Sequence, residues 1–398
     1  MITVEEVDNI ILNSITKTEI ESVTLNNCLG RVLAETIFAD RDFPPFNRVM
    51  MDGIAIRYTD WQAGMRTFKV QELLPAGSPA ITLKESGYCI EVMTGAVCPT
   101  YADTIIKYEQ LSIKDGVATV EPNTETKANQ HVHPQGSDRK INEIVIHNGK
   151  VITAAEIGVL ATVGKESVLV QKKLKVAIVA TGDELVDINQ TPLPHQIRKS
   201  NVYSLQAALT TKNFNSSIFH IVDSKEKLRE SLENILKNYN VVVLSGGVSK
   251  GKLDFVPEIL EELGVEKKLH FVKQRPGKPF WFGTFSNGVV FALPGNPNSS
   301  FVGLTRYVIP FLLRSEGTEP LRVKAKLAND FTFKPDLTYF LQVQLHYNSE
   351  GHLMATPQEG HGSGDLANLV DADGLIELPR GKTDYKKGEV YDCFFYRF

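Results

Sequence analysis

The residues best suited to chemistry lie in the run 241–260, VVVLSGGVSKGKLDFVPEIL. Its first residues are apolar and mostly β-branched, which predicts a strand buried on both faces, as in a parallel sheet. The loop that follows permits tight turning and close backbone approach, and the amino end of the next helix favours an anion. Its polar and glycine residues are Ser245, Gly246, Gly247 and Ser249, and Asp254 follows near the helix start. A carboxylate there is suited to hold a divalent cation, although a βα turn without a ligand fits the same residues.

The elements around this loop predict a doubly wound, mostly parallel α/β sheet. From Lys173 onward, strand patterns alternate with helix patterns. Ligands bind such sheets beyond the carboxyl ends of the strands, where Glu184 follows the first strand and Asp223 the second. Arg275 and Lys278 precede a strand pair and are suited to an oxyanion or a phosphate. Together these groups predict a site for phosphate and metal at one edge of the sheet.

A second loop of this kind, PGNPNSS at 294–300, lies between a predicted strand and a predicted helix. Pro294 and Pro297 stiffen it, and we expect Asn298 or Ser299 to cap the helix.

The length and composition indicate an ordinary multidomain protein rather than a nucleic-acid or membrane protein. At 398 residues the chain suggests two to four domains, at about 150 residues each, and its net charge of −4 comes without a basic stripe. The 4 cysteines form no CxxC motif, which predicts a reducing compartment, the cytoplasm. No stretch of about 18 apolar residues exists, so no membrane span is expected. Residues 1–15 predict a helix with a capping box of Thr3 and Glu6 rather than a signal peptide.

Two further regions predict β structure. Short alternating segments between residues 67 and 125 indicate a small β-rich domain, and residues after Gly317 indicate a closing β-barrel or sandwich. Asp52 precedes a glycine and is typical of a turn carboxylate that bonds its own backbone, and Thr94 is a phosphate ligand or a plain turn residue. Ser363, in the loop GHGSGD, binds an anion or belongs to a flexible connection.

A histidine pair lies in HVHPQGSD, residues 131–138, which ends in Asp138. His131 and His133 share one face if this segment is extended. A third ligand is not visible nearby, so a solvated strand face is favoured over a metal site.

Taken in order, several motifs resemble those of the MoeA-type molybdopterin molybdenumtransferases, which are related to the E domains of gephyrin and of the plant molybdenum insertase. The resemblance covers essentially the whole chain. The motifs are MDGIA, TGAVCPTYADTII, GSD, TAAEIGVLATVG, VAIVATGDELV, SGGVSKGKLDFV, RPGKPFWFG, LPGNPNSS and GSGDLANL.

The resemblance implies an architecture of four parts and a homodimer whose active site is shared between subunits. The implied parts are a linking domain (1–38 and 139–171), an inserted β-rich domain (39–138), an α/β molybdopterin-binding domain (172–316) and a C-terminal β-barrel (317–398). It also implies the reaction: molybdate is inserted into adenylylated molybdopterin, assisted by Mg²⁺, and AMP is released. Other proteins of molybdenum cofactor biosynthesis are implied partners.

The resemblance also assigns roles to residues. Asp254 and Glu184 would hold the cation, with Asp223 assisting, and Asp52, Thr94 and Asp138 would complete the catalytic site across the dimer. The implied substrate-binding residues are Ser245, Gly246, Gly247, Ser249, Arg275, Lys278, Pro294, Asn296, Pro297 and Ser363.

The sequence departs from the family pattern at several of these motifs. Leu337 and Gln342 stand where the family tends to place basic residues, which predicts weaker oxyanion binding from the C-terminal domain. The other departures are Ile54, Ser137, Lys252 and Arg275. A molybdopterin adenylyltransferase shares the GGVS-type loop but is typically a single α/β domain, and a protein-binding scaffold could keep the same fold.

Overall fold

The computed structural model describes residues 1–248, 255–360, 362 and 364–397, and it divides into two compact units. One unit contains Met1–Glu21, Gly30–Val32 and Leu169–Phe398, and the other contains Ser22–Leu29 and Leu33–Val168. Both units draw on separated parts of the chain, so neither is a continuous segment.

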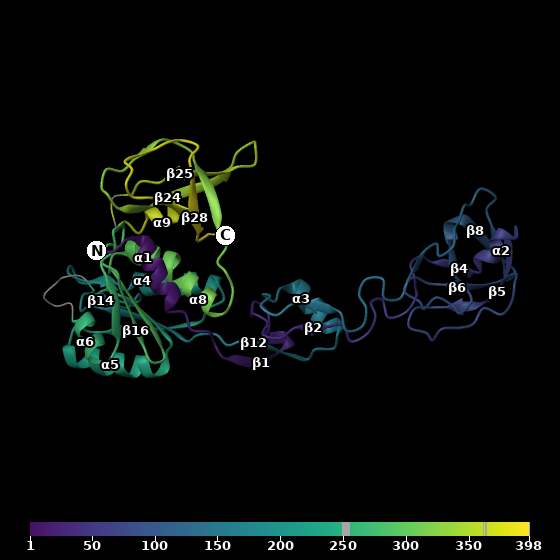
Figure 1. The fold of residues 1–398 in the computed structure, drawn as a ribbon, viewed down its shortest axis with the longest axis horizontal. Helices are drawn as coiled ribbons and strands as arrows, with labels where there is room; N and C mark the ends of the chain where they lie inside the picture. The colour runs from purple at the N-terminus through teal and green to yellow at the C-terminus, as the bar shows by residue number, and fades with distance from the viewer. Residues whose placement is uncertain (249–254, 361, 363, 398) are drawn as a thin grey trace. The chain divides into compact units, whose positions relative to one another are not determined.

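The first unit is built on a mixed sheet with the strand order β16-β13-β17-β21-β20-β18. Figure 1 shows this sheet, in teal and green, between helices on its two faces. The first four strands of this order run parallel, and β20 and β18 add antiparallel pairings, which confirms the predicted mostly parallel sheet. The bounds are β13 (Val176–Thr181), β16 (Ser216–Ile221), β17 (Val241–Ser245), β18 (Glu266–His270), β20 (Trp281–Phe285) and β21 (Gly288–Leu293).

Helices cover both faces of this sheet, because successive strand side chains point to opposite sides. Ile178 and Val243 pack in a core with α1, α4, α7, η3 and α8, whereas Val179 and Leu244 pack with α5 and α6. The bounds are α1 (Val4–Asn13), α4 (Ser200–Thr211), α5 (Lys225–Asn238), α6 (Val256–Glu262), α7 (Pro297–Gly303), the π-helical η3 (Leu304–Val308) and α8 (Ile309–Ser315). Within the described residues, none of the helices has the length and apolarity needed to cross a membrane.

The amino-terminal helix α1 begins as predicted. The Thr3 N–H donates to Glu6 Oε2 at 2.7 Å, and the Glu6 N–H donates to Thr3 Oγ1 at 3.3 Å, which confirms the capping box. Val4, Val7 and Ile11 are buried in the core of the α/β sheet. α1 therefore packs with the sheet although the sequence groups it with the linking residues, and the division into four parts stays a prediction.

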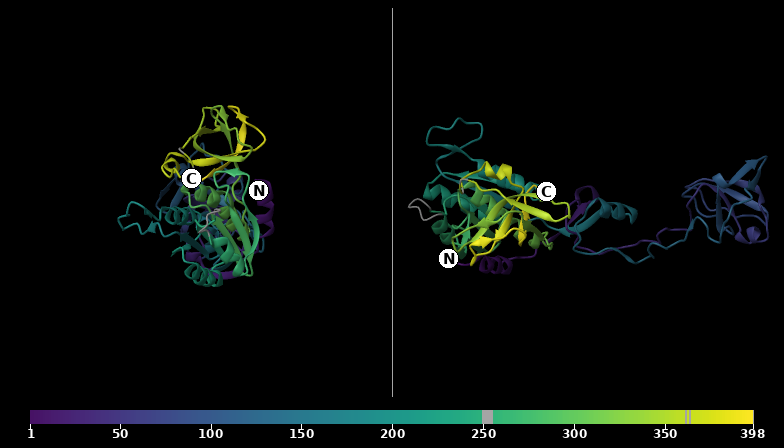
Figure 2. Two further views of the ribbon diagram at one scale, coloured as in Figure 1. Left: turned by 90° about the vertical axis from the view of Figure 1, so that its left-hand side faces the viewer. Right: turned by 90° about the horizontal axis from the view of Figure 1, so that it is seen from above.

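The carboxyl-terminal strands close into a barrel in the order β24-β25-β22-β28-β26, because β26 pairs with β24 as well as with β28. The carboxyl-terminal strands therefore form a barrel and not a sandwich. Figure 2 shows the barrel from two further sides. Its strands are β22 (Val323–Leu327), β24 (Thr338–Tyr347), β25 (Leu353–Pro357), β26 (Gly374–Leu378) and β28 (Val390–Phe395). Shorter elements beside them are β19 (Gln274–Arg275), β23 (Phe331–Thr332), α9 (Asn368–Asp371) and β27 (Asp384–Tyr385).

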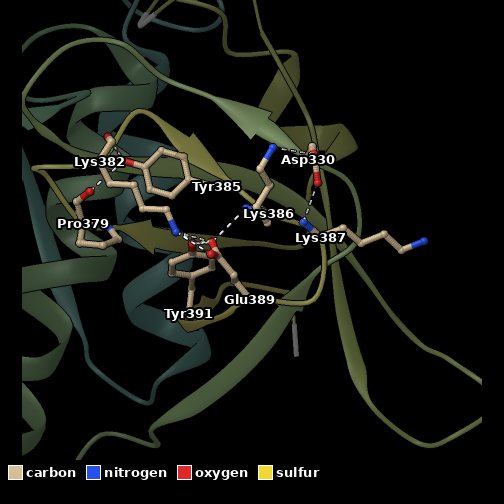
Figure 3. A network of polar contacts seen from close by, with 8 residues as sticks. All are labelled: Asp330, Pro379, Lys382, Tyr385, Lys386, Lys387, Glu389 and Tyr391. Atoms are coloured by element: carbon tan, nitrogen blue, oxygen red, sulfur yellow. Dashed lines mark hydrogen bonds and ion pairs between the residues drawn. The ribbon is translucent and has the colours of Figure 1, made fainter.

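At one side of this barrel, a network of hydrogen bonds and ion pairs connects residues 379–391 with one another and with Asp330 (Figure 3). Glu389 accepts hydrogen bonds from Lys382 Nζ at 2.6 Å, from the Tyr391 hydroxyl and from the Lys386 N–H at 2.9 Å. These bonds, that of Lys382 foremost, lower the pKa of Glu389 to about 2. The network therefore keeps its carboxylate charged across the ordinary pH range.

The second unit is mainly β structure, as predicted for residues 67–125. Its main sheet has the order β7-β4-β6-β5-β9-β8. The bounds are β4 (Gly53–Ile56), β5 (Thr67–Leu74), β6 (Tyr88–Val92), β7 (Thr104–Lys107), β8 (Leu111–Lys114) and β9 (Val117–Val120). Smaller pairs in this unit are β2 (Ile37–Phe38) with β11 (Ile144–Ile146), and β3 (Arg48–Val49) with β10 (Val132–His133). A further pair, β1 (Ile20–Thr24) with β12 (Ser167–Gln171), is divided between the two units, because the unit boundaries fall within both strands. The helices are η1 (Leu25–Asn27), α2 (Tyr58–Gln62), η2 (Tyr108–Gln110) and α3 (Ala154–Thr162), and Thr153 caps α3.

Glu316 is a buried carboxyl group directly after α8. It is 5% exposed, and within the described residues its Oε1 has no hydrogen-bond partner. Burial raises its pKa to about 7, although the charges of Lys173 and Arg31 pull the pKa down. Since the folded-state pKa lies above the ordinary glutamate value of 4.5, folding favours the protonated form.

Glu316→Gln is expected to remove a pH dependence of stability. As pH falls from 7 to 4.5, Glu316 becomes protonated in the folded state but stays mostly charged in the unfolded state. The wild-type free energy of unfolding therefore rises over this pH range. At pH above 7 the variant should be the more stable protein, by on the order of 2 kcal/mol. Urea unfolding across this pH range measures it, with exposed Glu5→Gln as the control. Parallel pH profiles of wild type and Glu316→Gln would contradict the expectation.

Candidate functional site

Two cavities open at the carboxyl edge of the α/β sheet, where β13, β16, β17 and β21 end. The smaller has a volume of about 280 Å³ and the larger about 690 Å³. Both lie within the first compact unit. Glu184 and Gly247 line both cavities, so the two form neighbouring parts of one region.

The smaller cavity brings together loops that the sequence placed at the same edge. Asp223 follows β16, and its N–H donates to Asp183 Oδ1 at 3.0 Å, which ties the loops after β13 and β16. The predicted residues that line this cavity are Glu184, Asp223, Ser245, Gly246, Gly247 and Pro297. Two carboxylates thus lie beside a glycine turn.

Close packing against Thr181 explains the glycine at the turn after β17. Gly246 has a φ of +109°, and a Cβ there would lie 3.0 Å from the carbonyl oxygen of Thr181. The Thr181 hydroxyl lies beside the same turn, is buried, and has no hydrogen-bond partner among the described residues. A buried hydroxyl without a partner costs free energy, so this group is suited to bond an oxygen of a ligand at the turn.

Asn201, in the first turn of α4, holds the glycine turn against the loop after β21. Its Nδ2 donates to Ser245 Oγ at 3.0 Å and to the Gly295 carbonyl at 2.7 Å. The sequence analysis missed this residue. Its only signal was a polar side chain at the start of a helix in a doubly wound sheet, a position that faces the strand ends.

The larger cavity lies between the α/β loops and the barrel. Its predicted residues are Glu184, Gly247, Arg275, Lys278, Pro294 and Asn296. The barrel contributes Leu337, Tyr339 and Gln342, and two glycines of the motif GHGSGD, Gly360 and Gly362, also line the cavity.

Arg275 and Lys278 are the cations that line this cavity within the described part of the chain, and no ion pair is found for either there. The Arg275 guanidinium lies 5.8 Å from the Phe333 ring centroid. Two exposed cations without a carboxylate partner favour an anionic ligand, since their charges would otherwise face only water.

Gln274 positions the loop that carries these cations. This side chain is 2% exposed, and its Nε2 donates to the carbonyls of Pro276 at 3.2 Å and Gly277 at 3.1 Å. The Tyr307 hydroxyl donates to Gln274 Oε1 at 2.5 Å. Sequence reasoning missed both residues, because their pairing joins segments 33 positions apart.

The predicted cap of α7 is wrong. Asn296 occupies the N-cap and α7 begins at Pro297, so Asn298 and Ser299 lie inside the first turn. The proline fixes the start of the helix two or three residues earlier than the predicted caps require. Asn298 Oδ1 instead accepts a hydrogen bond from Gln342 Nε2 at 3.0 Å, which joins α7 to the barrel.

In the second unit, Asp52 and Thr94 contact each other. Asp52 Oδ1 accepts hydrogen bonds from the Thr94 N–H at 2.6 Å and the Thr94 hydroxyl at 2.8 Å, not from its own turn as expected. The Thr94 backbone and then its hydroxyl lower the pKa of Asp52. This pair presents a charged carboxylate at an exposed surface.

Asp138 pairs with His133, whose Nε2 lies 2.9 Å from Asp138 Oδ1. His131 and His133 would share one face only if this segment were extended. His131 has a φ of +57° and therefore leaves the extended conformation. Across the described residues, no cluster of three histidine, cysteine or acidic side chains is arranged to hold a metal. Ser249, Lys252, Asp254 and Ser363 lie outside the described residues.

Comparison with known proteins adds evidence along the whole chain. Three family models match: the MoeA N-terminal region (domains I and II) at residues 2–164, the probable molybdopterin binding domain at 177–314, and the MoeA C-terminal region (domain IV) at 324–394. A molybdopterin molybdenumtransferase of Synechocystis is 38% identical, over 94% of this chain and 94% of its own. The chain belongs to the MoeA family.

Other relatives agree with this membership. A molybdopterin molybdenumtransferase of Bacillus subtilis is 31% identical, over 95% of this chain and 90% of its own. A crystal structure of a molybdopterin biosynthesis MoeA protein from Pyrococcus horikoshii superposes with a TM-score of 0.84 at 29% identity, covering 100% of both chains. The MoeA fold, including its C-terminal barrel, therefore extends across this chain.

Within this MoeA-family chain, the barrel residues Leu337 and Gln342 that line the larger cavity are uncharged. Leu337 lines it, and Gln342 is 4% exposed and bonded to Asn298. Among the described residues, the positive charge at this cavity therefore comes from Arg275 and Lys278 of the α/β loop 275–278.

Proposed function

We propose that this protein is a molybdopterin molybdenumtransferase, which inserts molybdate into adenylylated molybdopterin and releases AMP in molybdenum cofactor biosynthesis. The observation that carries the proposal is the similarity of 38% over 94% of both chains to a relative of that name. The two cavities at the sheet edge support it with a glycine turn, carboxylates and two cations.

The smaller cavity suits the nucleotide end of the substrate. Backbone N–H groups of Gly246 and Gly247, with the hydroxyls of Ser245 and Thr181, would bind the phosphate oxygens, and Ser249 would join them. Cleavage of a phosphoanhydride needs neutralisation of charge more than a covalent nucleophile.

The larger cavity suits the anion to be inserted. Arg275 and Lys278 would attract molybdate or the pterin phosphate, and Pro294 and Asn296 would shape the wall beside them, while Pro297 would contact the substrate from the smaller cavity. Ser363 would bind the same anion from the GHGSGD loop, whose Gly360 and Gly362 line this cavity.

Magnesium fits the residues present. Mg²⁺ is usually bound by one or two carboxylates together with substrate phosphate oxygens and water, and Glu184 and Asp223 both line the cavity beside the glycine turn. These two, with Asp254, would hold it, and when bound it would neutralise phosphate charge.

A homodimer would complete the site. Asp52, Thr94 and Asp138 belong to the second compact unit, and we infer that a second copy of the chain supplies them. We further infer that the protein acts in the cytoplasm, where the other steps of cofactor synthesis would supply the adenylylated pterin.

AMP release from adenylylated molybdopterin should depend on both molybdate and Mg²⁺, and its measurement tests the function. Thr181→Val is the sharpest variant, because it removes the unpartnered hydroxyl at nearly constant volume. We expect a loss of about tenfold in AMP release without a lower midpoint of thermal unfolding, since no internal hydrogen bond is broken.

Two other experimental results would favour a different function. Pyrophosphate release from ATP and molybdopterin, without molybdate dependence, would favour an adenylyltransferase. Absence of binding to adenylylated pterin in calorimetry would favour a scaffold.

A further inference from the structure

A third cavity lies at the opposite, amino edge of the α/β sheet and takes no part in the proposed reaction. Its volume is about 970 Å³, and it is lined where β21 begins, next to the starts of β13 and β17. The walls come from α1 and the segment after it, the end of α5, and the turn between β20 and β21. All of these belong to the first compact unit.

The cavity is strongly basic in a chain whose net charge is −4. Within the described residues, Glu19 is its one acidic lining side chain. Its lining lysines are Lys17, Lys172, Lys173, Lys175, Lys237 and Lys268. We call this cavity the lysine cleft.

Some of this charge is already balanced. Lys172 pairs with Glu19 at 2.7 Å, Lys237 with Glu233 at 2.7 Å and Lys268 with Glu266 at 2.6 Å. Lys17 and Lys175 are exposed, and no ion pair is found for either among the described residues. The half-buried Lys173 donates to the Asn213 carbonyl. The cleft therefore keeps an excess of positive charge.

The remaining lining favours a peptide over a free phosphate. Ile10, Ile15, Leu174 and Phe285 supply apolar surface between the lysines. The cleft lies at the end of α5, whose last carbonyls disfavour an isolated anion but accept N–H groups of a peptide backbone. Among the described residues, no arginine lines the cleft to hold a phosphate through two hydrogen bonds.

We infer that the lysine cleft docks an acidic segment of a partner protein, one in which glutamate or aspartate alternates with apolar residues. Carboxylates would face Lys17 and Lys175, and the apolar side chains would cover Ile15 and Phe285. Because the cleft and the two cavities of the proposed site lie at opposite edges of the sheet, docking leaves the proposed active site open.

Fluorescence anisotropy of a labelled peptide of alternating glutamate and leucine, titrated with the full chain at low salt, tests the docking. The double variant Lys17→Glu/Lys175→Glu should weaken binding by about tenfold or more, and added salt should weaken wild-type binding. The matched control is Lys227→Glu/Lys334→Glu, which changes the charge equally at exposed positions outside the cleft. It should bind as the wild type does.

Three results would overturn the inference. They are equal binding of a glutamine-for-glutamate peptide, equal weakening by the control variant, and displacement of the peptide by polyphosphate with tighter binding of polyphosphate itself. AMP release by Lys17→Glu/Lys175→Glu should equal that of the wild type, so a failed docking test leaves the proposed function intact.

Discussion

Replacing Lys278 by methionine is expected to lower kcat/KM for molybdate in AMP release by about ten- to one-hundred-fold. Lys278 lines the larger cavity with Arg275, and within the described residues no carboxylate pairs with it. Loss of a hydrogen bond to a charged group costs about 1.5–3 kcal/mol, which corresponds to this change in rate. The barrel offers no compensating charge from Leu337 or Gln342.

The controls for this variant separate charge from folding. Lys334→Met removes an exposed lysine of the barrel outside the cavity and should leave kcat/KM within about twofold. Lys278→Arg keeps the charge and should recover part of the activity, because the guanidinium differs in shape and reach. A Lys278→Met enzyme with unchanged kcat/KM would refute the role of this lysine in substrate binding.

Arg306→Met is expected to lower the free energy of unfolding of the first unit by about 3–5 kcal/mol. The Arg306 side chain is 12% exposed. It donates to both Asp8 carboxylate oxygens, at 2.8 and 2.7 Å, and to Glu377 Oε2 at 2.9 Å. Its loss would leave the half-buried Glu377 without its ion-pair partner, in a site where burial already raises the pKa of that carboxyl.

Urea unfolding followed by the fluorescence of Trp281 measures this effect, because Trp281 is buried in the sheet core. A Trp61→Phe background removes the other tryptophan, which lies in the second unit. Arg306→Met/Glu377→Met should regain most of the stability, since the uncompensated charge is then absent. Arg314→Met, which breaks an ion pair with the exposed Glu319, should cost no more than about 1 kcal/mol. An equal cost for the two single variants would show that the Arg306 cluster has no special role.

The Arg306 cluster also shows where sequence reasoning stops. Asp8 and Arg306 are 298 positions apart, and each alone is an ordinary charged residue on a helix. Their pairing docks α1 beside the barrel strand β26, although the sequence groups residues 1–38 with the linking region. No local pattern encodes that contact.

Some residues of the candidate site were likewise predictable from the sequence, and others were not. The strand ends after β13, β16 and β17 were predictable, because parallel strands of known order present their carboxyl ends at one edge. Asn201 and Gln274 were not, since their partners Gly295 and Tyr307 lie 94 and 33 positions away. Such side chains position the loops, and only the folded chain brings them together.

By itself, the sequence determined the features set by short spacing: the capping box of Thr3, the alternation of strands and helices after Lys173, and the glycine turn at 246–247. These depend on contacts within a few residues, which composition and period describe directly. The tertiary structure alone decided the closure of the barrel, the true cap of α7 at Asn296, and the hydroxyl of Thr181 beside the turn. Those depend on contacts between distant segments, whose geometry is set by packing of the whole core and not by any local pattern.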